Sequence, residues 1–377
     1  MRNKSVRIFL LTIMILIFFA GLDLILGAIL IRSSGSEFRT PHPYYHHGLI
    51  PNQQAIASWN NINYPVYTNS LGFRDAEIRN VPLESDKKRI LFMGDSHTEG
   101  VGLRFEDTFT GQVIAGVDTA RYEILNAAAV SYSPRIYYLK TKYLIEEKGL
   151  VFDELYVFID ISDIQNEIVY RNFDPGKPGA TGWLRYKIST RLMNRSYTVS
   201  TLNKFRQAME TRRFLRKTKL FDEFRSGEIP VDALDLYASF FSGFDDRTML
   251  SNPLFHGVSE WIYDDDFVKL AEWGLELGRD NMEKLHNLCL DHDIRMTICV
   301  HPWQKQIMVG DRRDLYVDFW ETFASEYETG FVNLYPVFID PPVSAVFGME
   351  FFLPGDNHWN RNGHWLAAGE LSKYMEQ

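Results

Sequence analysis

A candidate nucleophile, Ser96, follows a continuous apolar run in this chain of 377 residues. Residues 90–93 are ILFM, without alternation, as expected of a strand buried on both faces of a parallel sheet, and Gly94 permits a tight turn after it. Open α/β sheets bind ligands at the carboxyl ends of their strands, where Ser96 would lie. A Gly-Asp-Ser tripeptide alone is weak support for catalysis, so the rest of the chain must decide.

The second group of reactive side chains lies near the C-terminus, where Asp356 and His358 precede a predicted helix. A serine hydroxyl is a poor nucleophile until an imidazole takes its proton, and the imidazole needs a carboxylate to fix its tautomer. Ser96, His358 and Asp356 therefore form a candidate catalytic triad. The alternative is an Asx-type turn over 356–358 that caps the helix and leaves His358 at the surface.

These two segments resemble blocks of the SGNH, or GDSL-type, hydrolases. The sequence GDSH at 94–97 resembles the first block and DNH at 356–358 the last. The Asp-x-His spacing resembles the exported branch that includes alginate O-acetyltransferases, whereas most members place the aspartate three residues before the histidine. The segment TNSLGFRD at 68–75 resembles the lead-in of bacterial members, so the resemblance extends from about Asn69 to the C-terminus.

The resemblance implies an oxyanion hole that departs from the family pattern. In the family, the second block contributes a glycine N–H and the third an asparagine side chain. Segments 124–133 and 155–163 match these blocks, with Ala128 at the nearest glycine position and Ser162 at the asparagine position. The predicted oxyanion hole therefore consists of Ser96, Ala128 and Ser162. Loss of one donor typically costs about 10²–10³ in rate, so the change at Ser162 could weaken hydrolysis.

Substrate contacts are predicted at the carboxyl end of a later strand, 296–300. His301 could hydrogen-bond a substrate and Trp303 could stack on a sugar ring. The alternative is a rigid proline turn with a packing tryptophan. His97, beside the nucleophile, is predicted to be a structural or pocket-lining residue rather than a second base.

The scaffold for these residues is predicted from strands that alternate with helices. Strands are expected at 89–93, 122–125, 155–159, 296–300 and 331–334. Helices are expected at 136–147, 267–292, 315–326 and 362–375. This alternation predicts a parallel sheet with helices on both faces. The expected fold class is α/β: a flavodoxin-like three-layer α/β/α sandwich with a central parallel sheet of about five strands, a helical insertion and an N-terminal transmembrane helix.

The N-terminal segment 8–31 is apolar except for Asp23. As a helix it would be about 36 Å long, enough to cross a bilayer. Its flanking basic residues are Arg2, Lys4 and Arg7 before it and Arg32 and Arg39 after it. This bias predicts a cytoplasmic N-terminus and an outward-facing domain. A cleaved signal peptide is the alternative, although its apolar core is usually shorter. Asp23 has no visible partner in the span, which favours a place near one interface over a functional role.

The expected domains are a membrane anchor at 1–32, a tether and lead-in at 33–68, and a hydrolase-like domain at 69–377. A helical insertion at about 170–263 is basic although the whole chain has a net charge of −9. Between residues 191 and 219 the basic residues Arg191, Arg195, Lys204, Arg206, Arg212, Arg213, Arg216, Lys217 and Lys219 stand against Glu210 alone. The insertion is interpreted as a lid that attracts an acidic glycan or as a surface for anionic lipid; a solvated helical face is the alternative.

Two further features leave alternatives open. Cys289 and Cys299 could pair in an exported domain, or stay as two buried thiols. An acyl-enzyme on Ser96 could be resolved by water or by a sugar hydroxyl, so hydrolysis and transfer are equally compatible with the sequence.

The predicted function is a membrane-anchored serine esterase or O-acyltransferase, periplasmic or at the cell surface, that acts on acyl esters of a surface carbohydrate, acetyl esters above all. Its expected partners are an acylated carbohydrate or other ester substrate, the membrane and, as a further candidate, a membrane acyl-donor protein. No metal, organic cofactor or nucleic acid is expected. The alternative is a catalytically weakened component that binds glycan or protein in an export or modification assembly, in which Ala128 and Ser162 mark a decayed oxyanion hole.

Overall fold

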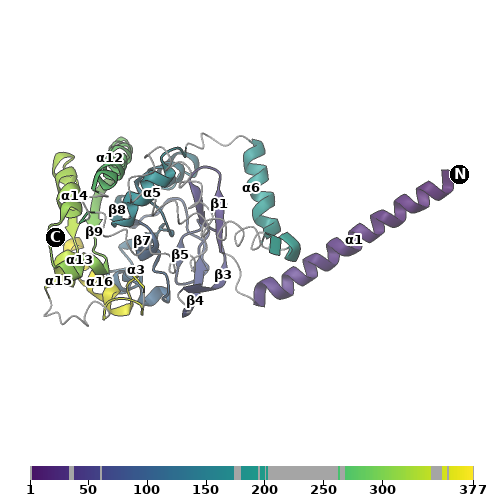
Figure 1. The fold of residues 1–377 in the computed structure, drawn as a ribbon, viewed down its shortest axis with the longest axis horizontal. Helices are drawn as coiled ribbons and strands as arrows, with labels where there is room; N and C mark the ends of the chain where they lie inside the picture. Colours follow the sequence, from purple (N-terminus) through teal and green to yellow (C-terminus); the bar gives the residue numbers. More distant parts are fainter. Residues whose placement is uncertain are drawn as a thin grey trace, which may run out of the picture.

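The computed structural model contains an α/β body and an N-terminal helix, α1 (Arg2–Ser33), which extends away from that body (Figure 1). The described residues are 2–33, 38–59, 62–173, 180–193, 196–199, 201–202, 262–263, 268–340, 350–354 and 356–376. Everything said below of absent contacts refers to these residues.

Five parallel strands form the centre of the body. They are β6 (Lys88–Met93), β7 (Tyr122–Asn126), β8 (Glu154–Ile159), β9 (Arg295–Val300) and β10 (Gly330–Asn333). Their order in the sheet is β10-β9-β8-β6-β7, which is the flavodoxin-like order. The five strands predicted from the sequence are thereby confirmed, and the chain reverses its direction of winding between β6 and β8. Ligands of open α/β sheets bind at such a point.

The strand β6 is buried on both faces because its side chains alternate between two hydrophobic clusters. Ile90 and Phe92 pack in one cluster, whereas Leu91 and Met93 pack in the other. All four side chains are at most 1% exposed. The apolar run without alternation is thus explained by helices on both sides of the sheet.

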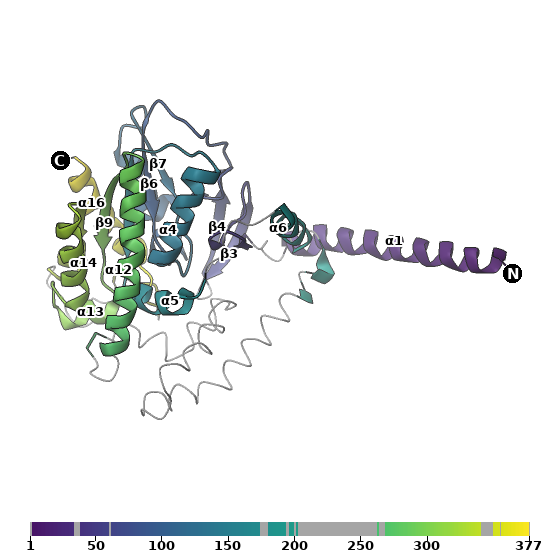
Figure 2. The ribbon, with the colours of Figure 1, turned by 90° about the horizontal axis from the view of Figure 1, so that it is seen from above.

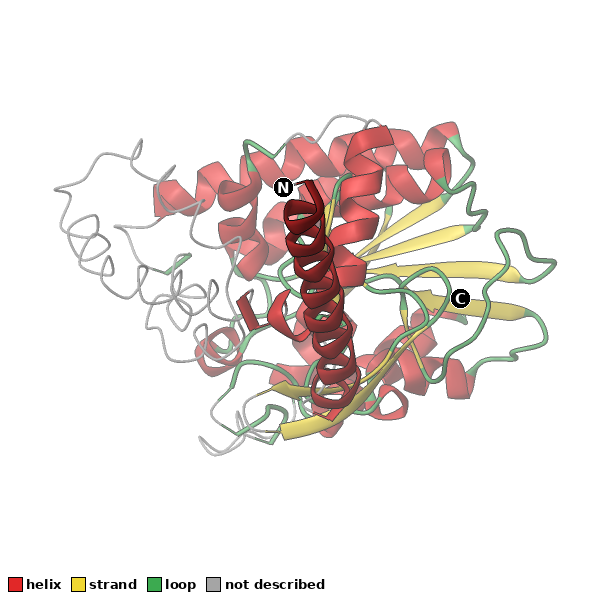
Figure 3. Ribbon diagram, turned by 90° about the vertical axis from the view of Figure 1, so that its right-hand side faces the viewer, coloured by secondary structure: helices red, strands yellow, loops and turns green. Residues whose placement is uncertain are grey.

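Helices cover both faces of the sheet (Figures 2 and 3). On one face lie α4 (Pro134–Lys142) with its π-helical extension Tyr143–Glu147, α5 (Ser162–Tyr170), α12 (Val268–Asp291) and α14 (Leu315–Glu326). On the other lie α3 (Phe109–Gly116), α13 (Gln304–Val309), α15 (Tyr335–Ile339) and α16 (Arg361–Met375). The side chain of Asn360 begins α16 by accepting the N–H groups of Asn362 and Gly363. The three layers and the four predicted helices are confirmed.

Three antiparallel strands extend the sheet beyond β7, and they correct the expectation of a tether at 33–68. They are β3 (Gln54–Trp59), β4 (Ile62–Thr68) and β5 (Arg74–Asp75). In β3 the buried side chains are Ala55, Ala57 and Trp59, whereas Ile56 is 54% exposed. Small residues inside and an isoleucine outside reverse the usual hydrophobic alternation, which explains why the sequence did not indicate a strand.

The same segment contains a separate two-stranded sheet. The strands β1 (Arg39–His42) and β2 (His46–Leu49) are antiparallel. Phe38, Tyr44, Tyr45 and Leu49 from this hairpin belong to the hydrophobic cluster on the α4 side of the main sheet. Residues 38–59 are therefore part of the folded body.

The helix α1 contains an apolar stretch, Val6–Gly27, with a mean hydropathy of 2.7, and nearly all of it is exposed. Its length and composition suit a membrane anchor or a signal sequence. Asp23, which has no partner within the span itself, accepts a hydrogen bond from Ser196 Oγ at 2.5 Å and another from the N–H of Thr198 at 2.7 Å.

Most of the basic insertion lies outside the described residues. The structure describes α6 (Ala180–Met193) and a few residues after it, whereas Arg195 and the basic residues from Lys204 to Lys219 are not included. The interpretation of the insertion as a lid or a lipid-binding surface stays a prediction.

The two cysteines are free and buried. Cys289 on α12 and Cys299 on β9 belong to the two different hydrophobic clusters, on opposite faces of the sheet. Burial raises the pKa of the Cys289 thiol to about 12. Of the two alternatives, the structure therefore supports two separate buried thiols and not a disulfide.

Candidate active site

Ser96 lies where β6 turns into the short helix α2 (Ser96–Glu99). Gly94 is required at this turn because a Cβ there would overlap the side chain of Thr98. Asp95 caps the helix by accepting the N–H of His97 through Oδ1 at 3.0 Å. The turn thus presents Ser96, which is 6% exposed, at the carboxyl end of the central strand.

His358 connects Ser96 with Asp356, as the order of a Ser-His-Asp triad requires. His358 Nε2 lies 2.8 Å from Ser96 Oγ, and His358 Nδ1 lies 2.6 Å from Asp356 Oδ1. An ionised carboxylate only accepts hydrogen bonds, so Nδ1 carries the proton that it donates to Asp356. The lone pair of Nε2 then faces the serine hydroxyl, which is the arrangement of a general base and a nucleophile.

Trp59 contacts the carboxylate of Asp356 from the other side. The indole Nε1–H of Trp59 donates to Asp356 Oδ2 at 2.7 Å, and its ring lies edge-on to His358, with 4.6 Å between the centroids. Burial alone would raise the pKa of Asp356, but the neighbouring His358 and the hydrogen bonds from His358 and Trp59 lower it. Sequence reasoning missed Trp59 because its strand was read as part of a tether.

His97 supports the loop that carries His358. Its Nε2 lies 3.0 Å from the carbonyl oxygen of Asn357, so Nε2 is the protonated nitrogen and donates to that oxygen. The rings of His97 and His358 are stacked, with centroids 4.8 Å apart and an interplanar angle of 24°. His97 therefore links the Ser96 turn to the C-terminal loop, which agrees with the structural role considered for it.

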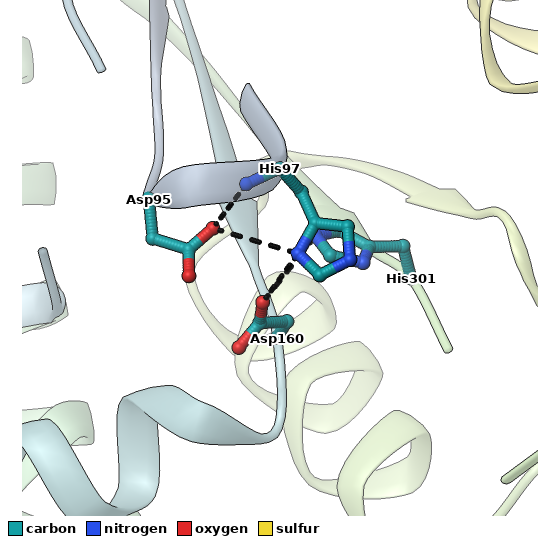
Figure 4. Close-up of side chains that lie close together, drawn as sticks. All are labelled: Asp95, His97, Asp160 and His301. Atoms are coloured by element: carbon teal, nitrogen blue, oxygen red, sulfur yellow. Dashed lines mark hydrogen bonds and ion pairs between the residues drawn. The ribbon is translucent and has the colours of Figure 1, made fainter. Parts of the chain in front are cut away.

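Four buried residues, Asp95, His97, Asp160 and His301, form a cluster beneath the triad (Figure 4). His97 Nδ1 lies 3.2 Å from Asp160 Oδ2 and 3.9 Å from Asp95 Oδ1, and His301 Nε2 lies 3.9 Å from Asp160 Oδ2. Burial and the charge of Asp160 raise the pKa of Asp95, whereas burial and the charge of His97 lower that of His301. Sequence reasoning did not single out Asp95 or Asp160.

The three residues predicted for the oxyanion hole differ in whether their donor groups are free to bind an oxyanion. The N–H of Ser96 donates no hydrogen bond within the described residues. The N–H of Ala128 donates to Asn126 Oδ1 at 3.1 Å, so an oxyanion could use it only if this bond opened. Ser162 Oγ donates to Asp160 Oδ1 at 2.5 Å and also lies 3.4 Å from Asp95 Oδ2, which is itself 3.1 Å from Ser96 Oγ.

The residues predicted to contact a substrate are buried. His97 and His301 are 1% exposed, and Trp303 is 8% exposed. Trp303 lies just before α13, with its ring centroid 6.2 Å from that of His97. A substrate would reach these side chains only after local movement, so their role in substrate binding stays a prediction.

Comparison with solved structures finds similar chains among esterases. A lipolytic protein of the G-D-S-L family from Desulfitobacterium hafniense matches with 10% identity and a TM-score of 0.38, over 76% of this chain and 99% of that one. An acetylxylan esterase from Geobacillus stearothermophilus matches with 11% identity and a TM-score of 0.39, over 78% of this chain and 95% of that one. A GDSL-like lipase from Bacteroides thetaiotaomicron matches with 10% identity and a TM-score of 0.36, over 78% and 92%.

The chain is thus similar to GDSL-type esterases over most of its length. No protein-family model and no curated protein matches its sequence. Since the identities and TM-scores of the structural matches are low, the function proposed below rests on the geometry of the site.

Proposed function

We propose that this protein is a serine esterase or O-acyltransferase with Ser96 as nucleophile, His358 as general base and acid, and Asp356 as the carboxylate that orients His358. The observation that carries the proposal is the pair of short contacts on His358, 2.8 Å to Ser96 Oγ and 2.6 Å to Asp356 Oδ1. Ser96 and the segment with Asp356 and His358 are distant in the chain, and they meet at the carboxyl end of β6, where the chain reverses its direction of winding.

The first half of the reaction would form an acyl-enzyme. Ser96 Oγ attacks the ester carbonyl carbon while its proton passes to His358 Nε2, and Asp356 stabilises the imidazolium. The tetrahedral intermediate collapses when the alkoxide leaves, taking the proton from Nε2. The N–H of Ser96 is the free donor for the oxyanion, and the Ser162 hydroxyl could add a second hydrogen bond if it turned away from Asp160.

The second half would decide between hydrolysis and transfer. Water or a sugar hydroxyl gives its proton to His358 Nε2 and attacks the acyl carbon, and Ser96 Oγ recovers its proton as it leaves. The Asp-x-His spacing resembles exported acetyltransferases, so acetyl esters of carbohydrates are the first substrates to test.

Labelling with a fluorophosphonate tests the nucleophile. We expect the purified protein to gain one phosphonyl group on Ser96, and both S96A and H358A to lose nearly all labelling and esterase activity, because the two residues act as one unit. The double variant should be scarcely worse than either single one. Unchanged labelling in S96A, or a folded wild-type protein that is never labelled, would contradict the proposal.

A binding protein with a weakened site is the second candidate. The observation that favours it is the engagement of the Ala128 N–H by Asn126 and of the Ser162 hydroxyl by Asp160. The fluorophosphonate labelling above distinguishes the two candidates, and S162A tests whether Ser162 contributes to turnover. If Ser162 supplies an oxyanion donor, turnover should fall by about tenfold to a thousandfold with little change in KM. Equal turnover would make it a spectator.

We further propose that α1 anchors the protein in a membrane, with the α/β body on the outer side. The 22-residue apolar stretch Val6–Gly27 and the basic residues before it support this orientation. The mature protein should then stay in the membrane fraction after alkaline carbonate washing and retain residues 2–33 by intact mass. A mature chain that lacks this segment would identify a cleaved signal sequence instead.

A further inference from the structure

Three buried polar atoms close to the triad face one another, and none makes a well-formed hydrogen bond in the described part of the chain; the closest pair, His97 Nδ1 and Asp160 Oδ2, is 3.2 Å apart. They are His97 Nδ1, Asp160 Oδ2 and His301 Nε2. The three side chains are at most 1% exposed. Buried polar atoms in folded proteins almost always have a partner, and an exception suggests a missing water or ion. A carboxylate oxygen of Asp95 completes the group, and the four ligand atoms lie within 4.8 Å of one another (Figure 4).

Contacts around the cluster orient these atoms inward. His97 donates its Nε2–H to the carbonyl of Asn357, which leaves the lone pair of Nδ1 directed at the cluster. Asp160 Oδ1 accepts both the N–H and the hydroxyl of Ser162, so Oδ2 is the oxygen that faces the two histidines. Asp95 is held in turn by the N–H of His97. Outer hydrogen bonds that fix the tautomer and orientation of histidine and carboxylate ligands are typical of metal sites.

The charges and distances suit a divalent cation. Two buried carboxylates need compensation, and a protonated His97 alone would leave both ring nitrogens of His301 without a partner. A tetrahedral ion with bonds of about 2.0–2.2 Å separates its ligand atoms by about 3.3–3.6 Å. Three of the six separations between ligand atoms are 3.2, 3.9 and 3.9 Å, and all lie within 4.8 Å, so modest side-chain movements would close the site.

We propose that Asp95, His97, Asp160 and His301 bind one divalent transition-metal ion of the zinc type. Two imidazoles and two carboxylates are ligands that Zn²⁺ accepts, whereas Mg²⁺ and Ca²⁺ prefer oxygen alone. The ligands follow β6, β8 and β9, so the ion would join the ends of three strands and, through His97, the loop that carries His358. None of the four belongs to the triad, and the site stands whether or not Ser96 is catalytic.

Metal binding by the full-length protein in detergent tests the proposal. After removal of metal with EDTA and dialysis, titration with ZnCl₂ should give one equivalent of bound ion by calorimetry and by elemental analysis. Co²⁺ should bind at the same site with the visible absorption of a four-coordinate ion. Saturating Zn²⁺ should raise Tm by about 5 °C, because only the folded state presents the site. MgCl₂ and CaCl₂ serve as oxygen-preferring probes and should not compete.

The variants D160N and H301Q should each weaken Zn²⁺ binding by at least about a hundredfold. H364Q is the matched control, because His364 is equally buried but lies outside the cluster, where its Nδ1 accepts the N–H of Phe109. H301Q keeps the charge of the site, so it decides the question if D160N does not fold. Wild-type protein that binds no stoichiometric Zn²⁺, or H301Q that binds it as tightly as wild type, would overturn the proposal in favour of a metal-free His97–Asp160 ion pair.

Discussion

Trp59 shows how a single side chain far from the triad in sequence can determine its geometry. Its indole N–H occupies one oxygen of Asp356, and His358 occupies the other. Because both oxygens are engaged, the carboxylate cannot rotate freely, and it holds the imidazole of His358 in one orientation. A neutral indole performs this task without adding a charge to a buried site.

Replacement of Trp59 by phenylalanine removes this hydrogen bond but keeps an aromatic ring against His358. We expect W59F to lower kcat/KM for a small ester by about tenfold to a hundredfold, because Asp356 gains freedom to rotate. Stability should fall by about 1–3 kcal/mol, since a buried acceptor loses its donor. Ester hydrolysis and thermal unfolding measure the two effects.

The matched control for this prediction is W320F. Trp320 is equally buried but lies in α14, against the core rather than the site. It should cost stability without a comparable loss of kcat/KM. If W59F and W320F reduce activity equally, the indole of Trp59 has only a packing role.

At this scale the sequence pointed to Ser96, Asp356 and His358, which lie within hydrogen-bond distance in the structure, and it missed the residues around them. Ser96, Asp356 and His358 could be chosen because chemistry restricts which side chains do this work. Trp59 and Asp160 could not be chosen, because their roles depend on which residues lie near them in space. Nothing local in the sequence distinguishes them from residues that only pack in the core.

At the scale of elements, the turn from β6 into α2 has no space for a side chain at position 94. A Cβ on Gly94 would overlap Thr98 and approach Phe158 Cβ to 3.1 Å. The backbone there passes close to two neighbouring segments, which is how Ser96 reaches the end of the sheet. The requirement at this position is steric, not a matter of backbone angles.

We expect G94A to destabilise the protein by about 1–3 kcal/mol and to reduce fluorophosphonate labelling of Ser96, because the turn must shift. G369A provides the control: a Cβ on Gly369 in α16 meets nothing within 4 Å, so alanine should raise stability by up to about 1 kcal/mol. Tm and the labelling rate are measured for both. Wild-type labelling in G94A would show that the turn can relax without moving the serine.

The central strands and most helices could be predicted because they have strong local patterns. Residues 90–93 and 155–159 are apolar runs, and α12 and α14 have one apolar face. The antiparallel strands β3 to β5 could not, since β3 buries two alanines and exposes Ile56. β3 pairs with the neighbouring β4, and the three strands join the central sheet only where Arg74 of β5 pairs with Asn126 of β7, a contact that no local pattern records.

At the scale of the whole molecule, His46 and His47, the first two residues of β2, make the stability of the fold sensitive to acid. His47 Nε2 donates to the carbonyl of Val130 at 2.7 Å, so its Nδ1 accepts from His46 Nδ1, also at 2.7 Å. Burial lowers the pKa of His46 to about 4, and burial together with the neighbouring His46 lowers that of His47 to about 3. Both rings are therefore neutral in the folded protein.

The unfolded chain takes up these protons below pH 6.5, whereas the folded protein does not until the pH is much lower. Stability is complete above about pH 6.5 and falls as the pH approaches 4 to 3, by at most about 1.4 kcal/mol per pH unit for each histidine. H47Q should lessen this slope when unfolding by urea is followed between pH 7 and 4. Parallel pH dependences of H47Q and wild type would assign acid sensitivity to other groups.

The route of the chain through the site has a consequence for synthesis. Ser96 and His358 are 262 positions apart, and Trp59 and Asp356 are 297 apart, so the reacting group closes only when both ends of the body meet. A ribosome-bound chain that ends before residue 358 carries Ser96 without its proposed base. On the proposed mechanism, activity begins only after translation of the body is nearly complete, and a prematurely terminated product has none.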